Sequence, residues 1–294
     1  MRLGASAPWR GAIGFVYRNP APQKENDMSD YVHGYSKRES TRLQDQAAAL
    51  VEIIHGEAIF PPGSRILEPG CGTGSQTVTL AANNPEASIT SMDVSSESLA
   101  MAKSRTAHLS NVTFKQGDIY DLPFEDESFD HVFVCFVLEH LNDPVKALGE
   151  LKRVLKTGGS ITVVEGDHGS FYCHPHSAAA MKAVDCLIKS QAMTGGNSLI
   201  GRELYPLLKK AGFEKPVVVP HIVYADSSKP ALVEGFSKNT FSAMIEGVRE
   251  RALELNLIDE ATFDEGVRGL YRATKEDGTF CYTFFRGTAV KNES

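Results

Sequence analysis

The chain has 294 residues, of which 42% are hydrophobic and 23% are charged, an ordinary balance for a soluble globular protein. Its formal net charge of −7 gives no sign of the basic surface that a nucleic-acid-binding protein usually carries. No run of about 18 apolar residues occurs, so we expect neither a membrane span nor a membrane partner.

The first 27 residues differ from the rest of the chain. They hold four basic residues, three prolines and the only tryptophan, whereas acidic residues appear only at Glu25 and Asp27. We expect residues 1–27 to be a disordered extension, or a stretch before a true start at Met28. The alternative is a targeting peptide, because such segments contain arginine and few acidic residues. Residues 28–294 are predicted to form one domain.

The five cysteines are widely spaced, and none belongs to a C-x-x-C pair. Their odd number and their spacing argue against a disulfide framework. We therefore expect reduced thiols and a cytoplasmic protein.

The domain begins with a predicted helix, followed by alternating strands and helices. Apolar residues recur at steps of four, three and four from Leu43 to Ile54, which places them on one helical face that ends at Gly56. Strands are then predicted at residues 65–67, 88–92, 112–114, 131–136 and 160–164. The helices between them cover residues 76–82, a segment capped by Ser95 or Ser96 that runs to Leu109, and a segment that Asp143 caps and Pro144 opens. Such alternation implies a parallel sheet with helices on both faces.

The pattern changes after Glu165. Helical stretches are expected near residues 177–192 and 201–211, a strand at 216–224, a broken helical stretch at 229–273 and a last strand at 279–286. We expect helical insertions near 171–212 and 229–273 to form a lid that shapes an apolar pocket. Phe241, Met244 and Ile245 stand at a spacing that is found more often in a core than in a pocket.

A glycine-rich turn follows the first predicted strand, in the segment E-P-G-C-G-T-G of residues 68–74. Glycine permits positive φ and lets a ligand approach the backbone closely. Because the turn leads into a helix N-terminus, it suits a phosphate or the carboxylate of an amino-acid moiety. The dinucleotide pattern G-x-G-x-x-G fails in both registers, since Ser75 and Thr77 occupy the places of its third glycine.

The pattern that is present, E-x-G-x-G-x-G, resembles motif I of the class I S-adenosylmethionine-dependent methyltransferases. The resemblance extends over residues 40–170. Residues 134–141 resemble the end of the fourth strand in methyltransferases that act on quinones and other small molecules. The resemblance implies a doubly wound, mostly parallel seven-stranded α/β sheet of the Rossmann-like methyltransferase type, with an N-terminal helix and an inserted helical lid. It also implies that the cofactor is S-adenosylmethionine.

The same resemblance assigns the cofactor-binding residues. Asp93 would accept both ribose hydroxyls, while Met92 and Val94 would pack on the adenine. Asp118 would accept from the adenine amino group. The full set of expected cofactor contacts is Glu68, Gly70, Cys71, Gly72, Gly74, Met92, Asp93, Val94, Gly117, Asp118, Ile119, Cys135 and, from an N-terminal segment that covers the site, Tyr35.

Candidate bases follow the fourth and fifth strands, because ligands bind at the carboxyl ends of strands in such sheets. His140 and Glu139 follow the fourth strand, and Glu165, Asp167 and His168 follow the fifth. We name His140, Asp167 and His168 as the expected catalytic residues. A base is needed only if the methyl acceptor carries a proton that must leave.

Residues 173–176 read Cys-His-Pro-His, but this close spacing suits a loop better than a tetrahedral cage, so no metal is expected. The leading hypothesis is an enzyme that methylates a small organic molecule at oxygen, nitrogen or carbon. The alternatives are a protein or RNA methyltransferase and a non-catalytic cofactor-binding protein. Residues 135–138 hold no Asn/Asp-Pro-Pro-Tyr-like sequence, which disfavours methylation of an amide or of an adenine amine. A homodimer is left open.

Overall fold

Seven strands form one sheet in residues 50–292, the part of the chain that this computed structural model describes. The strands are β1 (Arg65–Pro69), β2 (Ser88–Asp93), β3 (Val112–Gln116), β4 (Phe129–Cys135), β5 (Leu155–His174), β6 (Glu214–Ala225) and β7 (Thr279–Val290). Their order across the sheet is β3-β2-β1-β4-β5-β7-β6. Neighbouring strands pair in parallel from β3 to β5, whereas β7 runs antiparallel to both β5 and β6. The predicted fold class is confirmed, with a sheet that is mixed rather than fully parallel.

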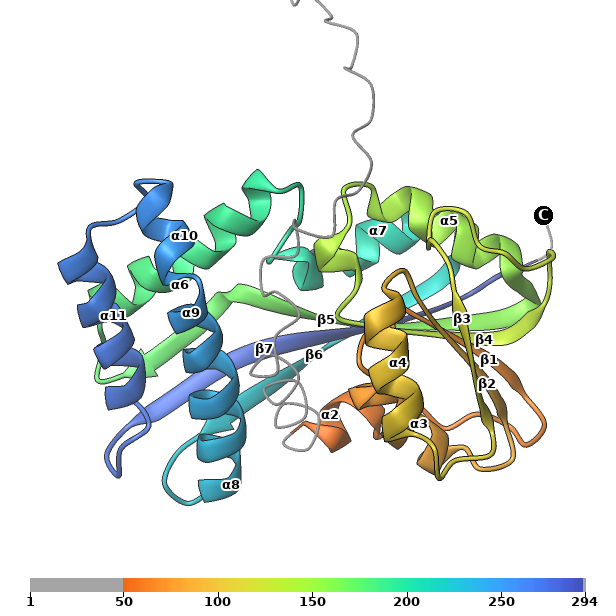
Figure 1. The fold of residues 1–294 in the computed structure, drawn as a ribbon, viewed down its shortest axis with the longest axis horizontal. Helices are drawn as coiled ribbons and strands as arrows, with labels where there is room; N and C mark the ends of the chain where they lie inside the picture. Colours follow the sequence, from red (N-terminus) through yellow and green to blue (C-terminus); the bar gives the residue numbers. More distant parts are fainter. Residues whose placement is uncertain (1–49, 293–294) are drawn as a thin grey trace, which may run out of the picture. The chain divides into compact units, whose positions relative to one another are not determined.

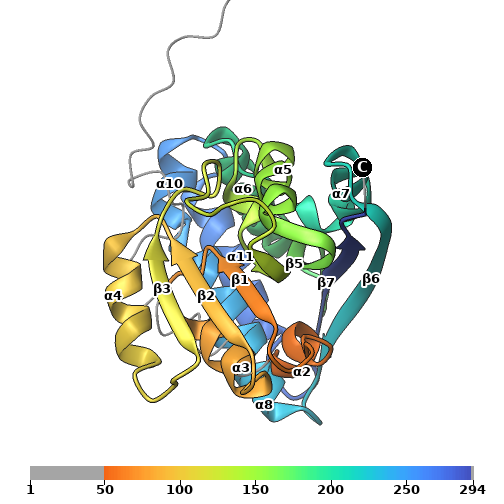
Figure 2. The same cartoon turned by 90° about the vertical axis from the view of Figure 1, so that its right-hand side faces the viewer.

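Helices cover both faces of the sheet (Figures 1 and 2). One face carries α5 (Pro144–Val154) and α7 (Leu204–Lys210), and the other carries α2 (Val51–His55), α3 (Ser75–Asn83) and α4 (Ser96–Arg105). Each face has its own buried apolar cluster, with leucines of α5 and α7 in one and residues of α2 and α3 in the other. Because crossovers between parallel strands bring their carboxyl ends to the same side, the ends of β1, β2 and β4 lie at one edge of the sheet, together with Glu165 in the middle of β5.

The predicted helix starts are confirmed. The Ser95 hydroxyl accepts from the Ser98 amide at 3.1 Å, and the Asp143 carboxylate accepts from the Lys146 amide at 3.0 Å. The first of these helices ends at Arg105 and not at Leu109. The Thr106 hydroxyl bonds the Ala102 carbonyl at 2.9 Å, and the chain then turns away from the helix.

Strand β5 is much longer than the predicted strand at 160–164. It spans Leu155–His174 and pairs with β7 along most of this length, with a register shift between Asp167 and Tyr172. Residues 171–174 therefore belong to the sheet, and the first inserted helix begins only at Ala178. The polar and glycine-rich stretch at residues 166–170 hides this continuation, because it breaks the apolar alternation of a strand.

The inserted helices gather where the last residues of β5 pair with the first residues of β7 (Figure 1). They are α6 (Ala178–Met193), α8 (Pro230–Leu232), the π-helix η4 (Val233–Ser242), α9 (Ala243–Gly247), α10 (Arg249–Glu254) and α11 (Glu260–Arg272). Helix α11 packs on α6. None of the described helices is long and apolar enough to cross a membrane.

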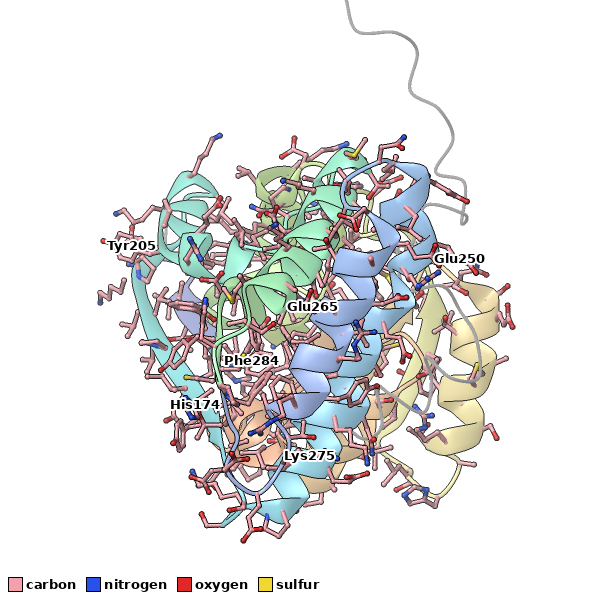
Figure 3. All side chains as sticks on the ribbon, turned by 90° about the vertical axis from the view of Figure 1, so that its left-hand side faces the viewer. His174, Tyr205, Glu250, Glu265, Lys275 and Phe284 are labelled. Atoms are coloured by element: carbon pink, nitrogen blue, oxygen red, sulfur yellow. The ribbon has the colours of Figure 1, made fainter. Side chains whose placement is uncertain are left out.

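An aromatic cluster lies between these helices and the sheet. Phe236 and Phe241 of η4 contact aromatic side chains of β7, with ring centroids 5.1–5.7 Å apart. In Figure 3 Phe284 lies in the interior of the view, whereas Tyr205 and Glu250 lie at its margins. We use the name aromatic cluster for Phe171, Phe236, Phe241, Phe280, Tyr282 and Phe284, each about 2% exposed or less. Phe241, Met244 and Ile245 are buried, as their spacing predicted.

Candidate active site

The glycine-rich turn has an open side at Gly72. Gly70, Gly72 and Gly74 all have positive φ, at +69°, +51° and +78°. A Cβ added at Gly70 would lie 2.6 Å from the Val137 side chain, and one at Gly74 would lie 2.9 Å from Ala102. A Cβ at Gly72 would meet no described atom within 4 Å. The first and third glycines thus permit close packing, whereas the second exposes backbone that a ligand can approach.

Asp93, the last residue of β2, holds this turn. Its Oδ2 accepts from the Gly72 amide at 2.8 Å, and its Oδ1 accepts from the Ser95 amide at 2.9 Å. Burial raises the pKa of Asp93, and these amide bonds oppose the rise. Each carboxylate oxygen has a further lone pair, so Asp93 can still accept from two hydroxyls of a ligand.

The residues expected to surround an adenine lie beside Asp93. Val94 is 57% exposed at this edge, whereas Met92 is buried in the core. Gly117 follows β3, and its amide donates to the Asp93 carbonyl at 3.1 Å. Asp118 is exposed and accepts from the Tyr120 amide at 2.9 Å, and Ile119 next to it is half-buried. The structure therefore brings these residues to one edge, with Val94 and Asp118 presented outward.

Glu68 lies beneath the turn and is 2% exposed. Its Oε2 accepts from the hydroxyls of Ser91 at 2.6 Å and Thr77 at 2.7 Å. Burial raises the pKa of Glu68 to about 7, since the carboxylate loses its hydration, although the two hydroxyl bonds oppose the rise. Burial and the nearby carboxyl groups also raise the pKa of the Cys71 and Cys135 thiols, which keeps both in the protonated form.

Asp167, an expected base, is held in an ion pair. Arg202 donates to both of its oxygens, at 2.8 Å and 2.7 Å, and the Gly169 amide donates to Oδ1 at 3.1 Å. Asp167 is 3% exposed. Because both of its oxygens are engaged, this geometry favours an anchoring role for Asp167 within β5, and its catalytic role remains a prediction.

The two expected catalytic histidines lie in polar surroundings. His168 is 5% exposed, and its Nδ1 lies 3.1 Å from the Tyr282 hydroxyl and 3.2 Å from the Ser198 carbonyl. His140 Nε2 lies 3.7 Å from a Glu139 oxygen. Both catalytic roles remain predictions. Tyr35, Leu43 and Ala47 lie outside the described residues.

Glu165 is the most deeply buried carboxyl group at this edge. Its Oε1 accepts from the amides of Val137 and Leu138, at 2.9 Å and 2.7 Å, and the residue is fully buried. Its other oxygen has no hydrogen-bond partner among the described residues. Burial, reinforced by the carboxyl group of Glu139, raises the pKa of Glu165 well above its usual value, although the backbone amides of Leu138, Val137 and Glu139 oppose the rise. Sequence position marked Glu165 as one of several candidates, but only the fold shows that its second oxygen is unsatisfied.

Arg202 had no signal in the sequence, because it comes 35 residues after its partner, in the short 3-10 helix η3 (Ile200–Glu203). No group of three or more His, Cys, Asp or Glu residues in the described part of the chain is arranged to hold a metal ion.

A family model described as "Methyltransferase domain" matches residues 67–163. Among curated proteins, a demethylmenaquinone methyltransferase of Staphylococcus aureus is 41% identical over 104 residues, which cover 35% of this chain and 43% of that protein. An uncharacterized 37.1 kDa protein in transposon TN4556 of Streptomyces fradiae is 36% identical over 188 residues, which cover 63% of this chain and 54% of that protein. The chain thus spans about half the length of the curated relatives it matches.

The fold is similar to that of the [4+2]-cyclase SpnF, with a TM-score of 0.53 and 23% sequence identity. The match covers 85% of this chain and 83% of that chain. A likeness at this identity concerns the architecture alone, and one architecture hosts many reactions.

Proposed function

We propose that the chain is a class I S-adenosylmethionine-dependent methyltransferase, and that it transfers a methyl group from this cofactor to a small organic molecule. S-adenosylmethionine supplies a methyl group already activated by its positively charged sulfur. The chain therefore has to hold the cofactor, align the acceptor in line with the carbon–sulfur bond and exclude water.

One observation carries the proposal, namely the open side of Gly72 tied to the carboxylate of Asp93. The exposed backbone and the start of α3 suit the carboxylate of the amino-acid part of the cofactor. Asp93 suits the two ribose hydroxyls, and Val94 suits a face of the adenine. Asp93 also brings a carboxylate beside the open backbone of Gly72. The residues present therefore fit S-adenosylmethionine.

The aromatic cluster supports an apolar acceptor. Phe136 follows β4 and lies 5.4 Å, ring to ring, from Phe284, so the cluster begins directly beside the loop that packs on the glycine-rich turn. The inserted helices cover it and would keep water from the acceptor. The five thiols form no disulfide, which suits a reducing compartment, and we place the enzyme in the cytoplasm.

The test is the transfer of label from methyl-labelled S-adenosylmethionine into a size-fractionated cell extract. We expect label in the small-molecule fraction with the wild type and almost none with Asp93→Ala. Heat-denatured protein controls for spontaneous methylation. Label in protein or RNA would contradict the choice of acceptor, and no label in any fraction would contradict methyl transfer itself.

A further inference from the structure

Only one of the two carboxyl oxygens of Glu165 has hydrogen-bond partners among the described residues. Its Oε1 accepts two backbone hydrogen bonds from the turn after β4, and its Oε2 accepts none among the described residues, although the side chain is fully buried. A buried acceptor without a partner destabilises the folded state, so such an atom needs an explanation. A ligand group that donates a hydrogen bond would supply the missing partner.

Glu165 lies between the glycine-rich turn and the aromatic cluster. On one side, Val137 donates to Glu165 and packs against the place where Gly70 lacks a side chain. On the other side, Tyr282 lies so close over Gly166 that a Cβ there would clash with its hydroxyl. A donor group that reaches Glu165 would thus have the cofactor turn on one flank and apolar rings on the other.

The ionisable groups around Glu165 are acidic or neutral. Glu139 faces it from the 3-10 helix η2 (Leu138–His140), the Cys135 thiol from β4 and the Tyr282 hydroxyl from β7. The cationic Arg202 of η3 forms an ion pair with Asp167. Burial and Glu139 together raise the pKa of Glu165, so its carboxylate takes up a proton more readily than an exposed one.

We propose that Glu165 Oε2 receives the proton of the methyl acceptor, whose reacting group is therefore an O–H or an N–H on an apolar body. This inference rests on the proposed function. The proton of the acceptor passes to Oε2, and the electron pair it leaves forms the bond to the methyl carbon. The electron pair of the broken carbon–sulfur bond stays on sulfur, which becomes neutral. Atoms and charge balance, because a carboxylate and a sulfonium become a carboxylic acid and a thioether.

The decisive variant is Glu165→Gln. Its amide oxygen can still accept from Val137 and Leu138, so the turn after β4 keeps its two bonds, but the side chain can no longer take up a proton. The matched control is Glu150→Gln on α5, where the half-buried carboxylate pairs with Arg153 on the helix surface. Three quantities are measured for the wild type and both variants. They are the rate of label transfer to the active extract fraction over a pH series, the affinity for S-adenosylhomocysteine by calorimetry, and thermal unfolding.

We expect Glu165→Gln to lower the transfer rate by 10²-fold or more, as loss of a general base does, with unchanged affinity for S-adenosylhomocysteine. The wild-type rate should rise with pH as Glu165 ionises, and Glu150→Gln should keep both the rate and this profile. An unchanged rate in Glu165→Gln would overturn the proposal while leaving methyl transfer intact. A tenfold loss of S-adenosylhomocysteine affinity would overturn it too, since Glu165 would then serve the cofactor.

If Glu165→Gln does not fold, the wild-type pH profile decides, and a rate that is flat with pH overturns the proposal. If the wild type labels no fraction, the proposed function fails, and the role of Glu165 fails with it.

Discussion

Replacing Gly72 by alanine separates the binding role of the turn from its folding role. The new Cβ would meet no described atom within 4 Å, so the fold should lose only the cost of holding alanine at φ +51°. That cost is about 1–2 kcal/mol for a non-glycine residue in the left-handed region. The methyl group would, however, occupy the side of the backbone that we assign to the cofactor, and we expect the affinity for S-adenosylhomocysteine to fall at least tenfold, about 1.4 kcal/mol.

Gly63→Ala is the matched control, because Gly63 also has positive φ, at +79°, and open space around it, but lies before β1. Urea unfolding should show similar losses of stability for the two variants, and calorimetry should show reduced affinity only for Gly72→Ala. If Gly72→Ala binds S-adenosylhomocysteine as tightly as Gly63→Ala does, the cofactor does not lie on the open side of the turn, and our placement is refuted.

Three further predictions concern the residues around this turn. The pKa of Glu68 is raised from 4.5 to about 7 in the folded protein, so folding favours its protonated form, and the free energy of unfolding should fall by about 3 kcal/mol as the pH rises from about 4.5 to 7. Glu68→Gln keeps an acceptor for the hydroxyls of Ser91 and Thr77 but cannot titrate. Urea unfolding of this variant should therefore not show the fall in the free energy of unfolding that Glu68 causes across this pH range. Asp93→Ala should weaken S-adenosylhomocysteine binding by about 1–3 kcal/mol in calorimetry through lost charged hydrogen bonds, and unchanged affinity would remove Asp93 from the site. Ser95→Ala removes the cap of α4 and should lower stability by about 1 kcal/mol in urea unfolding, whereas Ser96→Ala beside it should have a smaller effect.

The first half of the described fold could be predicted because its signals are local. The caps at Ser95 and Asp143, the glycine-rich turn and the apolar runs of β1 to β4 each lie within a few residues. The length of β5 could not be predicted in the same way. Its second half is polar in part, and it is a strand because β7, more than 100 residues later, supplies its hydrogen-bond partners.

In the candidate site, too, some features have local sequence signals and others depend on distant parts of the chain. The positions of Glu68 and Asp93 near the ends of β1 and β2 could be read from the sequence, whereas Glu165 and Asp167 lie in the middle of a β5 that continues past its predicted end. What each carboxylate does depends on partners that come from elsewhere in the chain. Asp167 meets Arg202 and is neutralised, whereas the described residues leave one oxygen of Glu165 unsatisfied. Of these two carboxylates, which are two residues apart in sequence, Glu165 is therefore better suited than Asp167 to accept a proton. No local sequence pattern distinguishes them.

The same contrast bears on the base that we propose in the middle of β5. A carboxylate that is exposed to water, or paired with a cation, holds a proton weakly near neutral pH. Glu165 is fully buried, it forms no ion pair with a cation among the described residues, and the acidic Glu139 raises its pKa further. The backbone bonds to Oε1 fix its orientation without using its second oxygen. The proposal therefore assigns proton removal to the carboxyl oxygen of Glu165 that has no hydrogen-bond partner among the described residues.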